Sequence, residues 1–360
     1  MRTQPQPDTP AGASAAGVGL TLADRRERIS LAPSLCSVQM RCAWIVILGL
    51  SAACGKDGRA TAPTSPSAAE ALSTPRTWTL TGLVISTQTA APVPGATITP
   101  FGVTTDATGA FAVTGTGVRA SRVTIEAPGH LARSTSINPA TEAPRLDLIR
   151  LAGFSADFYR ALVRDGYDHP GALQPLRRRT QPLRIYVRRV DEAGQPIETS
   201  LLALVERIAR ETSREWGDRL QVAVVESGTE TREGQAGWVT VKWLNPPVND
   251  FCGRAEVATS GGWLELNHRW DRCTCLMTAG HTMRHELGHA LGFYHTGNDA
   301  DVMAGLLTPC EARATRPSAR ERAHAAIAYT RPVGNTEPDN DPVGEAFVET
   351  GAGGPVIVVD

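Results

Sequence analysis

The stretch HELGHALGFYH, residues 285–295, contains three of the eight histidines of this 360-residue chain. His285 and His289 are four positions apart, and a helix turns about 100° per residue, so both imidazoles lie on one helical face and point the same way. Gly292 follows where the helix must end, because glycine adopts the left-handed conformation at little steric cost. We therefore expect a bend at Gly292 that returns His295 to the point at which the other two histidines are aimed.

The other side of the same helix is apolar. Met283, Leu287 and Leu291 follow one another at intervals of four residues. They lie on nearly the opposite face from the histidines, which predicts that they pack into the core. The histidine face is therefore expected to line a cleft.

Three histidines with one open coordination position are a ligand set of catalytic zinc sites. We expect His285, His289 and His295 to bind one Zn²⁺ ion. Bound zinc lowers the pKa of a water molecule to about 7, and Glu286 could take the proton from that water and hand it to the departing amine. The pattern therefore predicts a peptide-bond hydrolase with Glu286 as its general base.

A methionine follows the third histidine, in the sequence Asp301-Val302-Met303-Ala304. The extended histidine motif followed by this methionine resembles the metzincin metalloproteases. The resemblance covers roughly residues 154–332 and implies that Met303 forms a hydrophobic floor beneath the metal without binding it. It also implies that Ala255–Thr259 is the sheet edge above the cleft, where an extended polypeptide could add as a strand. We expect no cysteine-switch propeptide of the matrixin kind, which leaves latency without an explanation. The matrixin and astacin patterns both fit imperfectly, so the subfamily stays open.

Other polar residues near the motif are secondary candidates. Metal-bound histidines usually donate their second ring N–H to a carboxylate or carbonyl, and Glu265 and Asp301 are candidate acceptors. His281 lies one turn before His285. We expect it to make a hydrogen bond at the helix N-terminus and not to bind the metal.

Residues 153–335 are expected to form an α/β domain. A strand at Leu183–Val190 is followed by a helix whose apolar face runs to Trp216 and which Gly217 ends. The histidine helix is expected from about Met277, and Ser318 with Glu321 predicts a capping box on a last helix. Four strands are expected between the two long helices, at Leu220–Glu226, Trp238–Trp243, Ala255–Thr259 and Trp263–Asn267.

Residues 76–152 contain short apolar runs separated by Gly and Pro turns, which predicts a small all-β sandwich. The phrases Pro92–Ala96, Thr105–Phe111 and Ala127–His130 resemble the carboxypeptidase regulatory-like domain, a transthyretin-like sandwich, and this implies a non-catalytic module. The expected fold class is therefore α+β and multidomain, with a small all-β sandwich followed by a metzincin-like α/β zinc protease domain. The five expected strands are Leu80–Ile85, Ala96–Thr99, Ala110–Val113, Arg122–Ala127 and Arg145–Leu151.

The export signal is expected at residues 40–54. Met40-Arg41 opens an apolar stretch, Cys42–Ala53, that is too short to span a bilayer and ends in small residues, as signal peptides do. The stretch resembles a bacterial lipoprotein signal, which implies that Cys54 is lipidated and anchors the chain to a membrane. Plain export and a single N-terminal transmembrane anchor are the alternatives.

The segments outside these regions have no usable periodicity. We expect residues 1–39 to be a mis-called extension, with Met40 the true start, or disordered. Residues 55–75 are rich in Ala, Ser, Thr and Pro and are expected to be a disordered linker. Residues 336–360 are expected to form an acidic flexible tail. The basic run Arg177–Arg179 has no interleaved aromatic residues, so we interpret it as a solvated turn.

Four cysteines surround the histidine motif: Cys252, Cys273, Cys275 and Cys310. Export would expose them to an oxidising compartment, where two disulfides are expected. A bond between Cys273 and Cys275 is sterically poor, so each is expected to pair outward with Cys252 or Cys310. A four-cysteine metal site is disfavoured because the spacing lacks a Cys-x-x-Cys pair.

The net charge limits the possible partners. With 36 basic and 37 acidic residues, the net charge of −1 gives no general attraction to nucleic acid. We expect a secreted or lipid-anchored zinc endopeptidase that acts as a monomer on polypeptides. Two alternatives stay open: a non-catalytic adhesin or carbohydrate-binding protein with a structural zinc, and a zinc amide hydrolase acting on cell-wall material.

Overall fold

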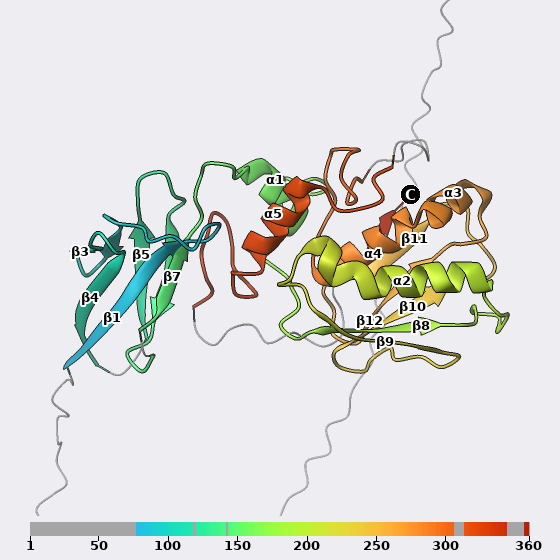
Figure 1. Cartoon of the computed structure of the whole chain (residues 1–360), viewed down its shortest axis with the longest axis horizontal. Helices are drawn as coiled ribbons and strands as arrows, with labels where there is room; N and C mark the ends of the chain where they lie inside the picture. Colours follow the sequence, from blue (N-terminus) through green and yellow to red (C-terminus); the bar gives the residue numbers. More distant parts are fainter. Residues whose placement is uncertain (1–76, 118–119, 142, 306–312, 344–355, 360) are drawn as a thin grey trace, which may run out of the picture. The chain divides into compact units, whose positions relative to one another are not determined.

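The computed structural model describes residues 77–117, 120–141, 143–305, 313–343 and 356–359. The predictions for the signal peptide, the start at Met40 and lipidation of Cys54 lie outside the described residues, as does Cys310. Within the described part, the chain has a mixed α/β fold with several sheets and few helices. Figure 1 labels most of these elements.

Residues 77–148 form two sheets. In the first, β1 (Thr77–Ser86) lies between β4 (Ala110–Thr116), which is antiparallel to it, and β7 (Arg145–Leu148), which is parallel. The second is antiparallel throughout, in the order β3-β2-β5-β6. Its strands are β2 (Thr97–Thr99), β3 (Val103–Thr104), β5 (Ser121–Glu126) and β6 (Arg133–Ile137).

Alternate residues of these strands point inward, and the two sheets share one hydrophobic core that includes Val84, Phe111 and Ile125. The sequence did not indicate β3 and β6. β3 has only two residues and β6 is Arg-Ser-Thr-Ser-Ile, so neither has an apolar run. That this part is a domain of its own stays a prediction.

The larger sheet has six strands in the order β13-β11-β12-β10-β8-β9. The four strands β9, β8, β10 and β12 are parallel, β11 is antiparallel to β12, and β13 is antiparallel to β11. The strands are β8 (Leu183–Arg188), β9 (Val222–Gly228), β10 (Trp238–Trp243), β11 (Gly253–Glu256), β12 (Gly262–Leu266) and β13 (Val356–Val359).

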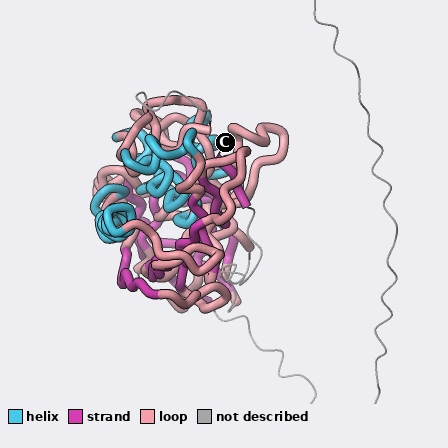
Figure 2. The backbone as a smooth tube through the Cα atoms, turned by 90° about the vertical axis from the view of Figure 1, so that its right-hand side faces the viewer, coloured by secondary structure: helices cyan, strands magenta, loops and turns pink. Residues whose placement is uncertain are grey.

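Five helices accompany this sheet: α1 (Ala156–Arg164), α2 (Thr199–Trp216), α3 (Asp271–Ala279), α4 (His281–Leu291) and α5 (Ala319–Ala328). Helix α2 packs on β8 and β9, and α4 packs on β11 and β12. The two helices also contact each other, so they cover the same face of the sheet (Figure 1, Figure 2). The helix that carries the histidine motif therefore packs on the β11–β12 end of the sheet.

Several predicted elements are confirmed. Helix α2 buries Val205, Ile208, Thr212 and Trp216 along one face and ends at Gly217, which has a positive φ of 115°. Strand β10 has the predicted bounds, and α5 begins with the predicted capping box.

The prediction of one histidine helix from about Met277 is wrong. Helix α3 ends at Ala279, and α4 begins at His281. Gly280 stands between them in the left-handed conformation, with φ 71°, and changes the direction of the chain. The break places His281 at the first position of α4.

The prediction of an acidic flexible tail over 336–360 is also wrong where the structure describes it. Asp339 is 1% exposed and Asp341 7% exposed. Asp339 binds the Arg331 guanidinium, which is fully buried, and Asp341 binds Arg133. The acidic side chains therefore face guanidinium groups and not solvent. Further along, β13 adds a strand to the sheet.

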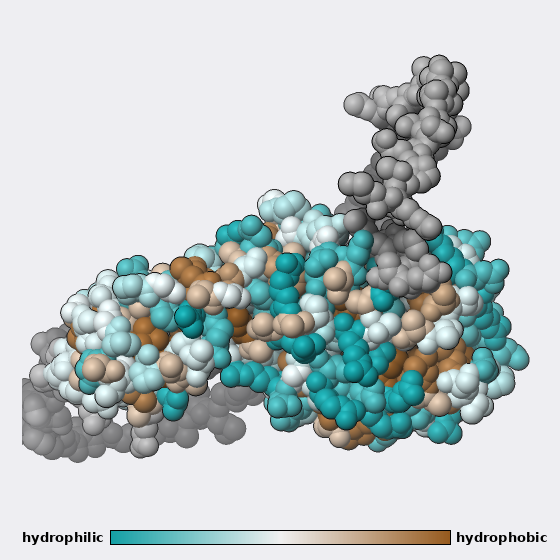
Figure 3. Space-filling model, turned by 45° about the horizontal axis from the view of Figure 1, so that its top comes forward, coloured by the Kyte–Doolittle hydropathy of each residue, from teal (hydrophilic) through white to brown (hydrophobic). Residues whose placement is uncertain are grey.

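No helix in the described ranges is both long and apolar enough to cross a membrane. Figure 3 shows mostly hydrophilic residues on the face in view, with smaller hydrophobic areas. Within the described part of the chain, the large hydrophobic side chains that are exposed are Leu151 and Val343.

Candidate metal centre

The three histidines of the motif converge. One ring nitrogen from each of His285, His289 and His295 lies within 4.8 Å of the others, so the three could hold a metal ion. The Nε2 atoms of His285 and His289 are 3.0 Å apart. The cluster is buried, with His285 and His289 fully covered and His295 5% exposed. The sequence-based expectation that the chain bends back to bring the third histidine to this point agrees with the geometry.

Gly292 makes that bend. It ends α4 with φ 109° and ψ 17°, and its N–H donates to the carbonyls of Gly288 and His289. A side chain at this position would collide with the carbonyl oxygen of Arg177. Gly292 is therefore required by its backbone conformation and by its close contact with a neighbouring segment.

The outer nitrogen of each histidine has its own acceptor. Nδ1 of His285 donates to the carbonyl of Val302 at 2.7 Å, and Nδ1 of His289 donates to the carbonyl of Phe293 at 2.7 Å. A carbonyl oxygen can only accept, so in both rings the hydrogen is on Nδ1 and the Nε2 lone pair faces the centre. The hydrogen bonds thus orient both rings with their lone pairs toward one point.

Two facing lone pairs at 3.0 Å repel each other unless a cation or a proton lies between them. Burial disfavours the proton: it lowers the pKa of His289 to about 3 and holds the pKa of His285 well below its ordinary value. In a tetrahedral zinc site, Zn–N distances of 2.0–2.1 Å place two ligand nitrogens about 3.3 Å apart, close to the observed spacing. The residues therefore fit a metal ion held by three nitrogens.

Asp168 accepts the hydrogen bond from Nδ1 of His295, at 2.8 Å. This bond lowers the pKa of the Asp168 carboxyl, with the charge of His295 adding to the effect. Asp168 is 127 residues away from His295 in the sequence, and nothing in its local pattern indicated the contact. Only the folded chain brings the segment after α1 to the third histidine.

The predicted acceptors Glu265 and Asp301 have hydrogen-bond partners other than the histidines of the cluster. Glu265 pairs with Arg254 on the neighbouring strand. Asp301 accepts from Thr296 Oγ1 and from Ser318 Oγ, and so orders the turn after the third histidine. The acceptors are instead Asp168 and two main-chain carbonyls, which side-chain patterns do not reveal.

Glu286 follows His285 in α4. Both of its carboxylate oxygens are buried, and neither has a hydrogen-bond partner within the described residues. Burial raises the pKa of Glu286 well above its ordinary value. The carboxylate lies against Gly253 of β11, where any side chain would collide with Glu286 Oε1. A buried carboxylate without a partner is costly, which points to a ligand or water that completes the site.

Met303 packs against the histidine helix. It is fully buried, and a side chain at Gly288, between the first two histidines, would collide with its sulfur. Its carbonyl accepts from Thr296 N at 2.7 Å, which joins the turn to the strand-like segment that follows His295. Met303 therefore packs against α4, and its role as the floor of a metal site stays a prediction.

Glu321 fixes the turn that contains Met303. Its carboxylate accepts from the main-chain N–H of Met303 at 2.9 Å and of Val302 at 3.1 Å, in addition to its capping-box bond with Ser318. Since the carbonyl of Val302 is the acceptor for His285, Glu321 indirectly sets the orientation of that ring. The sequence indicated the cap but not this second role.

His281 does not join the cluster. Its Nδ1 donates to the carbonyl of Ala314 at 2.6 Å, so the expected hydrogen bond at the helix N-terminus is replaced by one to a different segment. Burial lowers the pKa of His281 to about 4. Its ring centroid is 5.8 Å from that of His285.

A disulfide joins Cys252 to Cys273, with the Cα atoms 5.3 Å apart. This confirms the expected outward pairing of Cys273. The bond ties the residue before β11 to α3 and so helps to position the strand that contacts Glu286. Cys275 is also disulfide-bonded.

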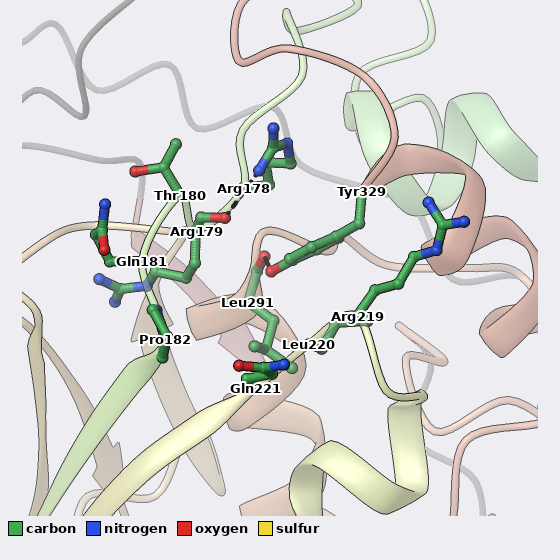
Figure 4. A pocket seen from close by; sticks show the side chains of 10 residues that line it. All are labelled: Arg178, Arg179, Thr180, Gln181, Pro182, Arg219, Leu220, Gln221, Leu291 and Tyr329. Carbon is green, nitrogen blue, oxygen red and sulfur yellow. Dashed lines mark hydrogen bonds between the residues drawn. The ribbon is translucent and has the colours of Figure 1, made fainter. Parts of the chain in front are cut away.

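A separate hollow of about 200 Å³ lies at the C-terminal end of α4 (Figure 4). Tyr329 donates to the carbonyl of Leu291 at 2.7 Å, and Arg179 Nε donates to the carbonyl of Ala290 at 3.0 Å. These bonds satisfy carbonyls that a helix end leaves without partners. The interpretation of Arg177–Arg179 as a solvated turn is therefore wrong, since Arg179 is buried and caps the histidine helix.

Fold and site together define a mixed α/β protein whose three buried histidines could hold one metal ion. No protein-family model matches the chain, and no curated protein sequence matches it. Among solved structures, it is similar to the crystal structure of metalloproteinase-II from Bacteroides fragilis, with 12% sequence identity over 60% of this chain and 81% of that chain. The TM-score is 0.29.

Proposed function

We propose that the chain is a zinc-dependent endopeptidase of the metzincin type. The observation that carries the proposal is the pair of inward-facing Nε2 atoms of His285 and His289, with a nitrogen of His295 within 4.8 Å of them. Glu286, the residue after His285 in the same helix, has a buried carboxylate without a hydrogen-bond partner in the described part of the chain. A metal held only for stability would gain nothing from a buried carboxylate without a partner. A hydrolytic site needs such a group next to the metal.

The ion and the residues of the chain would have different roles in the reaction. Zinc, when bound, would lower the pKa of a water molecule to about 7 and polarise the scissile carbonyl. Glu286 would accept the proton of the attacking water and deliver it to the leaving amine, which is a poor leaving group until it is protonated. Asp168 and the carbonyls of Val302 and Phe293 would keep the ligand rings in place during turnover.

Other features of the chain belong to the same proposal. Export through residues 40–54, with lipidation of Cys54, would place the peptidase at the cell envelope. A carboxypeptidase regulatory-like module at residues 76–152 would be non-catalytic. The shared core of the two sheets in 77–148 supports a sandwich-like module in this part of the chain.

The test uses the full chain, expressed under oxidising conditions, beside Glu286→Ala. Zinc per chain is measured by mass spectrometry and hydrolysis is measured with casein. We expect one zinc in both proteins and a loss of activity of about 10²–10⁴-fold or more in the variant, the range that general acid–base catalysis supplies. Glu230→Ala is the matched control, because Glu230 is exposed and takes no part in the proposed mechanism. Equal activity of the unmutated chain and Glu286→Ala would rule out the mechanism.

A further inference from the structure

Strand β13 occupies the outer edge of the large sheet. It pairs antiparallel with β11, with Val356 opposite Glu256 and Val359 opposite Gly253. The other edge of β11 is taken by β12. Both edges of β11 are therefore filled by strands of this chain.

Strand β11 is also the strand that contacts the proposed catalytic group. A side chain at Gly253 would collide with Glu286 Oε1, and α4 packs directly on β11. Just beyond β11, Ala258 N donates to the carbonyl of His289 at 3.1 Å. A polypeptide that reaches Glu286 in an extended form would lie alongside this strand.

Neighbouring strands lie about 4.8 Å apart, and one edge of a strand has room for one partner. An extended polypeptide that adds to β11 by main-chain hydrogen bonds would need the edge that β13 fills. Occupation by β13 and addition of an extended substrate are therefore mutually exclusive.

The segment is suited to this position. Val356–Val359 is Val-Ile-Val-Val, and β-branched residues favour strands. Residues 344–355 connect it to Val343, so the segment is tethered to the same chain. Tethering by a short linker gives an effective concentration of about 1 mM, enough for a weak strand to fill its site most of the time.

We propose that Val356–Val359 is an intramolecular inhibitor that pairs with β11 and keeps extended polypeptides from the cleft. The inference rests on the proposed peptidase function. What it adds is that the last described strand is the resident occupant of the β11 edge.

The test compares the zinc-loaded full chain with a full chain carrying Ile357→Pro and Val358→Pro. Alternate residues of a strand direct their N–H groups to the same neighbour, so prolines at two consecutive positions remove at least one bond to β11. With a fluorogenic peptide substrate, we expect kcat/KM to rise about tenfold through a lower KM, with kcat unchanged. Glu349→Pro with Thr350→Pro, outside β13, is the control and should match the unmutated chain. An unchanged kcat/KM in the β13 variant overturns the inference.

A binding measurement separates this inference from the proposed function. A labelled peptide with the sequence of residues 354–360 is titrated into both full chains in the Glu286→Ala background. Binding of the peptide to the proline variant alone supports occupation of the β11 edge by β13. This holds even if none of the proteins hydrolyses the substrate, because missing hydrolysis would contradict only the peptidase proposal. Equal binding to both chains, or binding to neither, overturns the inference.

A second experiment tests the inference without proline substitutions, which could prevent folding. Residues 346–351 are replaced by the recognition site of a sequence-specific protease, and the full chain is cut there after folding. Activity should rise about tenfold as the released segment is diluted. No rise on complete cutting overturns the inference.

Discussion

Asp168 and His295 are joined by a hydrogen bond of 2.8 Å from the histidine Nδ1 to the carboxylate. His295 is the ligand candidate that lies beyond the end of α4, so it lacks the helical support of the other two. The Asp168 carboxylate therefore orients the ring of His295, as the carbonyls of Val302 and Phe293 orient the rings of His285 and His289.

The first prediction concerns this pair. Asp168→Ala should lower zinc affinity by about 10–100-fold, because the loss of such a bond leaves a ligand ring free to turn. Asp168→Asn keeps an acceptor oxygen and should restore part of the affinity. Zinc affinity is measured by competition with a chromogenic chelator, with the exposed Asp157→Ala as control. Equal affinity in Asp168→Ala and the unmutated chain would contradict the positioning role.

The second prediction concerns Gly292. Gly292→Ala should lower the free energy of unfolding by about 3 kcal/mol or more, since it adds a collision with the Arg177 carbonyl to the strain of a positive φ. The matched control is Gly194→Ala, where φ is also positive at 77° but the space is open. There the cost should be about 1–2 kcal/mol. Urea unfolding of both variants gives the comparison, and equal costs would show that the close contact does not matter.

The third prediction concerns Glu321. In Glu321→Gln the amide nitrogen cannot accept, so the main-chain N–H of Val302 or of Met303 loses its acceptor, at a cost of about 1–3 kcal/mol. The same change should weaken zinc binding, because the Val302 carbonyl orients His285. Unfolding and zinc titration are measured in parallel with Glu230→Gln. A stability loss with unchanged zinc affinity would limit Glu321 to a structural role.

The local part of the site could be predicted from sequence because it depends on helix geometry. The positions of His285, His289 and Gly292 follow from periodicity and from the conformational freedom of glycine, and the structure brings these residues together as expected. The contacts of Asp168 and of the carbonyls of Val302 and Phe293 could not be predicted, since they join distant segments or involve the main chain.

The fold, like the site, has elements that local sequence patterns predict and contacts that they do not predict. Helix α2 and strand β10 have strong local patterns, and their predictions are confirmed. Arg179 and Asp339 appeared as solvated charges because their partners, a helix end and a buried guanidinium, exist only in the folded chain. The four residues of β13 form too short a run to be recognised without the strand they pair with.

The fourth prediction concerns removal of the metal. At a free zinc concentration 100 times the dissociation constant, binding should stabilise the folded chain by about 2.7 kcal/mol. A chelator should therefore lower the melting temperature of the unmutated chain. The same treatment should change His295→Ala much less, because that variant lacks the third nitrogen. Identical melting with and without zinc would contradict a metal site.

The most direct test of the central claim is zinc-edge X-ray absorption on the zinc-loaded full chain. We expect three imidazole nitrogens at about 2.0–2.1 Å and one oxygen ligand, with one nitrogen fewer in His295→Ala. Sulfur ligands, or the same nitrogen count in both proteins, would contradict it.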